Sequence, residues 1–189
     1  MYKRQLPRVD GLLPQNVGAA VQALEAGQLC TLSQNLLDQL SGLSVPGRRS
    51  LHRLGSIDVV LDVAHNVEAV AELVQLLNER PVSGKTVALF GVMGDKSIRD
   101  MIQAAQSVFD EWNLIDLSHV PRAMATHSLV ELLSPTETVR ETGCFADLWD
   151  ALLARGRAGD RIVVFGSFFS VAEASQLLAA QGDEGSGGR

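Results

Sequence analysis

Cysteine, aromatic residues and excess positive charge are all scarce in this 189-residue sequence. The only two cysteines, Cys30 and Cys144, exclude a disulfide framework and a cysteine-rich zinc site, and favour a reducing compartment such as the cytoplasm. The net charge is −6 and no stripe of lysine or arginine is present, so we expect no nucleic-acid partner and no anionic membrane partner. No apolar run approaches the roughly 18 residues that a membrane-spanning helix needs.

Two common nucleotide-binding motifs are also missing. The sequence contains no G-x-x-x-x-G-K-[ST] phosphate loop, and no G-x-G-x-x-G follows a strand, so a nicotinamide cofactor lacks its usual fingerprint. What is present is an ordinary hydrophobic fraction of 46%, enough for a buried core. The length suits one domain and the end of another.

From about residue 57 onward, short apolar runs alternate with stretches of helical periodicity. We expect strands at residues 57–61, 86–90, 114–117, 161–165 and, more weakly, 138–139. We expect helices at residues 66–79, 97–107, 128–133, 145–154 and 170–180. Apolar strands that are each followed by a helix predict an α/β fold, with a Rossmann-like, mostly parallel sheet covered by helices on both faces.

The first 45 residues do not follow this alternation. Helical periodicity predicts helices at residues 16–26 and 33–40, with Asn16 as the N-cap of the first. The Pro46-Gly47 pair then breaks the pattern. We therefore expect a remnant of another domain at 1–45, the α/β domain at 46–181, and a Gly-rich disordered tail at 182–189.

The loop that leaves the strand at residues 57–61 carries the first group of candidate binding residues. Ligands of parallel sheets bind beyond the carboxyl ends of the strands, near helix N-termini. There a carboxylate at Asp62 can accept ribose hydroxyls, and His65 and Asn66 can meet an anion. The alternative reading makes Asp62 a turn residue, His65 a surface side chain and Asn66 an ordinary N-cap.

Two further loops follow strands in the same way. Gly166 permits close backbone approach and Ser167 offers a hydroxyl at a helix N-terminus, where it could hold a carboxylate or phosphate or serve as a simple N-cap. The loop from Gly91 to Lys96 contains two glycines and an Asp-Lys pair, a pattern that most often marks a solvated turn. Arg122 could bind an acidic substrate, although a solvent-facing arginine is the more frequent case.

Taken in order, these motifs resemble a known family. They are Asn16 opening an Ala-rich helix, Pro46-Gly47-Arg48, Asp62-Val-Ala-His65-Asn66, Gly94-Asp95-Lys96 and Gly166-Ser167-Phe168. Their order and spacing resemble the dihydrofolate synthase/folylpolyglutamate synthase family of the Mur ligase superfamily, and the similarity runs from about Leu13 to Leu178. The resemblance implies a C-terminal, Rossmann-like domain of an ATP-dependent ligase in folate synthesis.

In this family ATP phosphorylates the carboxylate of dihydropteroate or of a folate, and the amine of L-glutamate then attacks the acyl phosphate. The resemblance implies ATP contacts for Asn16 near the adenine, Arg48 at the phosphates and Asp62 at the ribose. It implies catalytic positions for His65 and Ser167, which would orient the incoming glutamate. Asn66, Lys96 and Arg122 are further substrate candidates.

The sequence departs from the family in two ways. Val67 replaces the proline that usually follows the Asp-x-Ala-His-Asn motif, which affects the rigidity of the loop more than its chemistry. The family's amino-terminal ATPase domain has no counterpart here, and with it are missing the phosphate loop and the Mg²⁺ ligands. We therefore expect no metal ligands in this chain, an ATPase domain of the same enzyme as its partner, and no ligation by the chain alone.

Two other interpretations stay open at this point. One is an inert binding module that keeps the fold and binds glutamate or a nucleotide weakly. The other is the C-terminal domain of a peptidoglycan ligase of the same superfamily, although the pairing of Asp-x-Ala-His-Asn with Gly-Ser-Phe favours folate.

Overall fold

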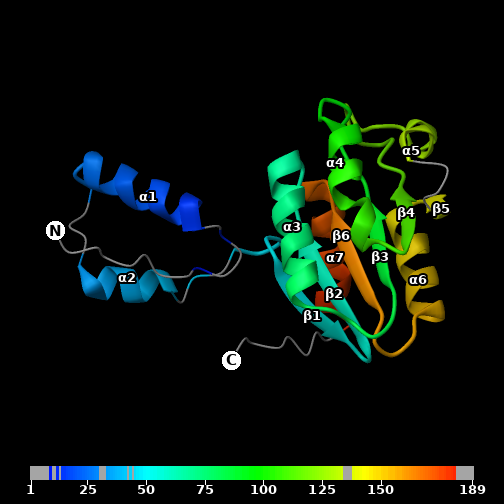
Figure 1. The fold of residues 1–189 in the computed structure, drawn as a ribbon, viewed down its shortest axis with the longest axis horizontal. Coiled ribbons are helices and arrows are strands. Elements are labelled where there is room, and N and C mark those ends of the chain that lie inside the picture. Colours follow the sequence, from blue (N-terminus) through cyan, green and yellow to red (C-terminus); the bar gives the residue numbers. More distant parts are fainter. Residues whose placement is uncertain are drawn as a thin grey trace. The chain divides into compact units, whose positions relative to one another are not determined.

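A computed structural model of the chain describes residues 9, 12, 14–29, 33–41, 43, 45–133 and 138–181. The chain divides into two compact units, residues 1–50 and 51–189, and each unit is described by itself (Figure 1). Cys30 and the tail expected at 182–189 lie outside the described residues. Cys144 is an exposed thiol. None of the described helices is long and apolar enough to cross a membrane.

The first unit contains the two helices expected there, α1 (Pro14–Ala26) and α2 (Gln34–Ser41). The prediction that Asn16 caps α1 is wrong, because the helix already begins at Pro14, whose fixed φ suits the first helical turn. Val17 and Val21 are buried on one face of α1, where they pack with Val9. For α2, the N–H of Leu36 donates to Ser33 Oγ at 3.2 Å, an ordinary N-terminal cap.

The second unit is built around a six-stranded sheet in the order β1-β2-β6-β3-β4-β5. The strands are β1 (Ser50–Leu54), β2 (Ile57–Asp62), β3 (Thr86–Phe90), β4 (Glu111–Ile115), β5 (Val139–Gly143) and β6 (Arg161–Phe165). Strands β2, β6, β3, β4 and β5 run parallel to one another. Every residue of the central strands β3 and β6 is buried, which confirms the expected mostly parallel α/β sheet.

Three strands differ from the prediction. The weak strand expected at 138–139 spans Val139–Gly143. Strand β1 was not expected; it is joined to β2 by Gly55 and Ser56 alone, a connection short enough only for an antiparallel pair. The strand predicted at 114–117 instead spans Glu111–Ile115. Its first half contains the polar residues Glu111 and Asn113, which are nevertheless buried. Arg155 contacts Glu111 through an ion pair, so a charged residue can begin this buried strand.

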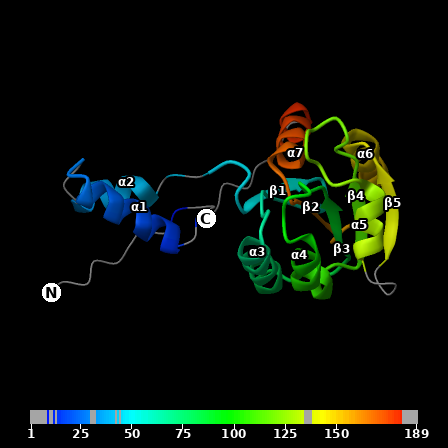
Figure 2. The ribbon, with the colours of Figure 1, turned by 90° about the horizontal axis from the view of Figure 1, so that it is seen from above.

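Helices cover both faces of the sheet, as Figure 2 shows from above. They are α3 (Val67–Glu79), α4 (Ile98–Ala105) continued by a 3-10 turn at Gln106–Val108, α5 (Thr126–Leu132), α6 (Phe145–Arg155) and α7 (Phe168–Ala180). Helices α3, α4 and α5 pack into one core, which contains Trp112, and α6 and α7 into the other, which contains Trp149. Both tryptophans are completely buried. The alternating sides of each strand therefore supply two separate hydrophobic layers.

Candidate functional site

The carboxyl ends of the central strands are level with one another. Asp62 at the end of β2 is the register partner of Phe165 in β6, and Phe165 is also the partner of Phe90 in β3. Because these strands are parallel, the loops that follow them open at one edge of the sheet. These loops, at 62–66, 166–167 and 91–96, are the three that the sequence analysis identified as candidate ligand-binding loops.

The loop after β2 is held by its own polar side chains. Asp62 is the last residue of β2 and only 5% exposed, and its Oδ1 accepts the N–H of Ala64 at 3.0 Å. Asn66 caps α3 by accepting the N–H of Ala69 at 2.8 Å, as the alternative interpretation expected. His65 is half-buried between them rather than a fully exposed surface side chain.

The loop after β6 is tightly constrained. Gly166 has φ of +103°, and a Cβ at this position would lie 2.6 Å from the carbonyl oxygen of Gly91 and 2.7 Å from the Phe90 ring, so only glycine fits. Ser167 is 4% exposed and caps α7, because its Oγ accepts the N–H of Ser170 at 3.1 Å. The expected close backbone approach at Gly166 and the N-cap at Ser167 are both confirmed.

The two loops meet above the junction of β2 and β6. The rings of His65 and Phe168, the residue after Ser167, have centroids 6.0 Å apart. Helices α3 and α7 lie on opposite faces of the sheet, yet both begin at this edge. The N-terminus of each helix is the positive end of the helix dipole. The imidazole of His65 lies near the start of α3, and the hydroxyl of Ser167 lies at the start of α7. This arrangement favours an anionic ligand with hydrogen-bond acceptors.

Lys96 and Arg122 lie together at a second place, beyond β3 and β4. The N–H of Gly94 donates to the carbonyl of Arg122 at 2.7 Å, which joins the two loops. Lys96 Nζ lies 3.0 Å from Asp95 Oδ2, and this bond, aided by the charge of Arg122, holds the pKa of Asp95 below its usual value. Arg122 is exposed and has φ of +67°, a conformation that non-glycine residues rarely adopt.

The remaining predicted contacts for the nucleotide, Asn16 and Arg48, belong to the first unit. Asn16 is exposed in the first turns of α1. Arg48 is half-buried, and its N–H donates to the carbonyl of Val45 at 3.1 Å in a turn. Asp62, by contrast, belongs to the second unit.

No group of three or more His, Cys, Asp or Glu side chains that could hold a metal ion occurs among the described residues.

Two features of this edge were missed from the sequence, the burial of Ser170 and the contact of Phe168 with His65. Ser170 is completely buried, and its Oγ lies 2.7 Å from Ser167 Oγ. The Ser-x-x-Ser spacing that opens α7 was the signal for this pair, since a cap and the third residue of a helix face each other. Phe168 is 61% exposed beside His65, and only the fold brings these two rings together.

The sequence and the fold match one class of domain. The Mur ligase, glutamate ligase domain, matches residues 47–168, and the chain belongs to this family. The chain is homologous to the dihydrofolate synthase/folylpolyglutamate synthase of Escherichia coli, with 31% identity over 171 residues. That alignment covers 90% of this chain and 39% of the relative. A relative from Buchnera aphidicola (subspecies Schizaphis graminum) is 28% identical over 84% of this chain and 37% of its own length.

Solved structures give the same result. The Escherichia coli enzyme FolC in complex with DHPP and ADP superposes with a TM-score of 0.77 at 30% identity, covering 93% of this chain and 41% of that one. The Yersinia pestis enzyme complexed with AMPPNP and Mn has a TM-score of 0.78 at 27% identity over 94% of this chain and 42% of that one. A bifunctional enzyme with Mn, AMPPNP and L-glutamate bound has a TM-score of 0.77 at 27% identity, over 95% and 42%. The chain thus spans about 40% of the length of these ligases and matches their C-terminal part.

Proposed function

We propose that this chain supplies the glutamate-orienting domain of an ATP-dependent ligase that joins L-glutamate to dihydropteroate or to a folate. The observation that carries the proposal is the meeting of two helix N-termini, with His65 and Phe168 in ring contact 6.0 Å apart and Ser167 between Gly166 and α7. The homologous ligases, one of them with L-glutamate bound, support this substrate class. Their names also favour folate over a peptidoglycan precursor.

The proposed reaction has two steps. ATP phosphorylates the substrate carboxylate, which gives an acyl phosphate and ADP. The amine of glutamate then attacks the carbonyl carbon, so that a C–N bond forms while the C–O bond to phosphate breaks; inorganic phosphate leaves, and the amine gives up a proton to solvent. Glutamate carries carboxylates that suit the dipole ends of α3 and α7, and the domain contributes to the rate by positioning the amine against the carbonyl carbon.

We assign His65 and Ser167 to glutamate, as hydrogen-bonding groups that hold its carboxylate and orient its amine. Lys96 and Arg122 supply positive charge further along the same edge, where Asp95 fixes the lysine. Asn66 already uses its side-chain oxygen to cap α3, which leaves its amide N–H₂ for substrate.

For the nucleotide we assign Asp62, Asn16 and Arg48. A guanidinium suits phosphate oxygens, and a carboxylate at the end of a parallel strand suits ribose hydroxyls. The magnesium ligands and the phosphate loop belong, in this proposal, to an ATPase domain to which residues 1–45 are related, with the ligase domain at 46–181. A reducing cytoplasm is the compartment that we propose, and the exposed thiol of Cys144 is compatible with it.

The test is a chimera in which this chain replaces the matching C-terminal part of the Escherichia coli relative. We expect the chimera to release ADP in a glutamate-dependent way and to support growth of a strain without its own folate ligase. His65→Ala and Ser167→Ala should each raise KM for glutamate about tenfold or more, with a smaller effect on KM for ATP.

The matched control is His119→Ala, because His119 is exposed and lies in the turn before Arg122. A folded chimera that releases no ADP would favour the inert binding module over the ligase. Equal glutamate dependence in the parent, His65→Ala and Ser167→Ala chimeras would overturn the assignment of these two residues.

A further inference from the structure

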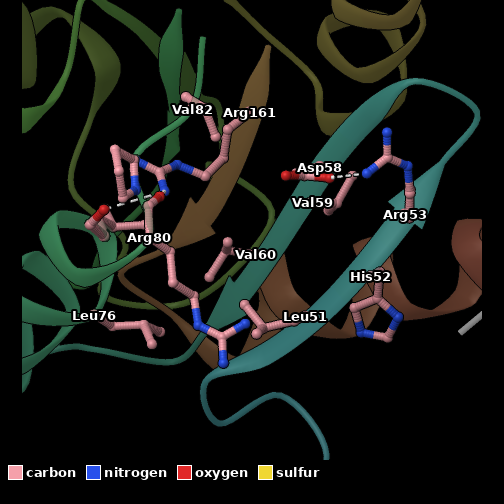
Figure 3. Close-up of a pocket in the computed structure, with 12 residues that line it drawn as sticks. Leu51, His52, Arg53, Asp58, Val59, Val60, Leu76, Arg80, Val82 and Arg161 are labelled. Carbon is pink, nitrogen blue, oxygen red and sulfur yellow. Dashed lines mark hydrogen bonds and ion pairs between the residues drawn. The ribbon is translucent and has the colours of Figure 1, made fainter. Parts of the chain in front are cut away.

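A pocket of about 260 Å³ lies in the second unit, away from the ligand edge described above (Figure 3). It is bounded by β1, by the first half of β2 around Asp58 to Val60, and by the end of α3. Arg161, the first residue of β6, closes it. Because β2 and β6 end at Asp62 and Phe165, the pocket lies toward the opposite ends of the same strands.

Arg161 is buried, and its guanidinium forms no hydrogen bond to a carboxylate in the described part of the chain. It is 6% exposed; Nη1 donates to the carbonyls of Leu77 at 3.3 Å and Arg80 at 2.6 Å, and Nη2 donates to Thr86 Oγ1 at 3.0 Å. These bonds cap the C-terminus of α3. Its Nε has no hydrogen-bond partner among the described residues. Burial lowers the pKa of this guanidinium, with some opposition from Asp58, so the charged form is under-stabilised.

The lining has an excess of positive charge. Arg53, Arg80 and Arg161 face it, and Asp58 is the only carboxylate among the residues that form it. Asp58 is already paired, since its Oδ1 lies 3.3 Å from Arg53 Nη1 (Figure 3). Two guanidinium groups, Arg80 and Arg161, are thus left with no ion pair in the described part of the chain. Guanidinium groups bind carboxylates as planar, two-donor forks.

Apart from His52, the rest of the lining is apolar, with Val60, Leu76 and Leu77 buried beneath it. A volume of about 260 Å³ lies just below the usual range of small-molecule sites, roughly 300–1,000 Å³, and is too small to enclose a nucleotide. The positive charge and the small volume of this pocket fit a small ligand that has an anionic group attached to an apolar part.

We propose that this pocket is a second ligand site, which binds a small organic carboxylate through Arg80 and Arg161 and buries its apolar part against Val60 and Leu76. The site is independent of the proposed glutamate site, because it shares no residue with the loops after β2 and β6.

The test is NMR titration of the complete ¹⁵N-labelled chain with 4-methylbenzoate and, as a neutral isostere, 4-methylbenzamide. We expect saturable shifts with the acid at the amides of Val59, Val60 and Leu77 and at Arg161 Nε–H. Affinity for the amide should be at least about tenfold weaker, because it cannot form a charge-assisted pair with guanidinium.

Three variants complete the experiment. Arg80→Gln removes an exposed guanidinium without touching the backbone carbonyl that Arg161 uses, and should weaken binding of the acid about tenfold. Val82→Phe fills the pocket without a change in charge and should abolish binding. Arg99→Gln, on α4 and also exposed, is the matched control and should bind normally.

Several results would overturn the proposal. The first is the absence of saturable shifts up to about 20 mM, a concentration at which even fragment-sized ligands bind to a formed pocket. The second is equal affinity for the acid and the amide. The third is a set of shifts confined to residues 62–66 and 166–170. Normal binding of the acid by both Arg80→Gln and Val82→Phe would overturn it as well.

Discussion

Asp62 and Phe165 are register partners at the last positions of two neighbouring parallel strands. Each strand runs directly into a loop that caps a thirteen-residue helix, α3 behind Asp62 and α7 behind Phe165. The level ends of the two strands are the reason why the imidazole of His65 and the start of α7 meet.

Replacing the cap of α3 should cost stability. Asn66→Ala removes the side-chain oxygen that accepts the N–H of Ala69, so we expect a loss of about 1 kcal/mol in the free energy of unfolding. Asn66→Asp keeps the acceptor and adds a negative charge at the helix start, so it should stay close to the parent. Denaturation in urea measures both. An Asn66→Ala variant as stable as the parent would show that the cap contributes nothing.

Gly166 should tolerate no side chain. Gly166→Ala must both adopt a positive φ and displace the Gly91 carbonyl or the Phe90 ring, and we expect a loss of about 3 kcal/mol or more. Gly55→Ala is the matched control, since Gly55 has φ of +60° with nothing within 4 Å of the added Cβ. It should lose only about 1 kcal/mol. Similar losses for the two variants in thermal or chemical unfolding would contradict the proposed steric conflict.

The pair of Glu111 and Arg155 should make stability depend on pH. Burial raises the pKa of Glu111, but the hydrogen bonds from Arg155 and Asn113 outweigh it, so the pKa in the folded state lies below the usual value of a glutamate. A lowered folded pKa means that the carboxylate stabilises the fold above the unfolded pKa, and that this contribution disappears as pH falls through the folded value.

We therefore expect Glu111→Gln to cost about 2 kcal/mol at pH 7 and progressively less below about pH 4.5. Unfolding curves of parent and variant at pH 7, 5, 4 and 3 measure the difference. Asp150→Asn, an exposed carboxylate on α6, is the control for the loss of one negative charge. A difference between parent and Glu111→Gln that stays constant over this range would refute the ionic contribution.

Arg122 combines an exposed side chain with a backbone conformation that costs energy. Asparagine tolerates positive φ, so Arg122→Asn should change the free energy of unfolding by less than about 0.5 kcal/mol. In the active chimera the same substitution should raise KM for glutamate about tenfold if the guanidinium binds substrate. Arg99→Asn serves as the control for charge. An unchanged KM would leave Arg122 as a solvent-facing arginine.

The sequence predicted the features that depend on local pattern and on general rules of parallel sheets. Strands β3 and β6 were correctly located because they are short apolar runs, and the ligand edge follows from where such strands end. The caps at Asn66 and Ser167 follow from residue type at a helix start. The family was also correctly predicted, because several weak motifs occurred in one order.

What was missed depends on contacts between distant residues or on backbone geometry. Glu111 begins a buried strand only because Arg155, on α6, neutralises it. Strand β1 is a partly exposed edge strand without a clear apolar pattern. Arg122 has a positive φ, and its carbonyl accepts a bond from Gly94 in a distant loop; no local signal indicates either feature.

The sheet separates the two tryptophans, which are fluorescent, as well as the two hydrophobic cores. The sequence has only two tryptophans, and the structure assigns Trp112 to the layer beneath α3, α4 and α5, and Trp149 to the layer of α6 and α7. Replacing either one with phenylalanine leaves a protein whose intrinsic emission reports on a single side of the sheet. Loss of structure on the α3 side and on the α7 side can thus be timed separately without any attached dye.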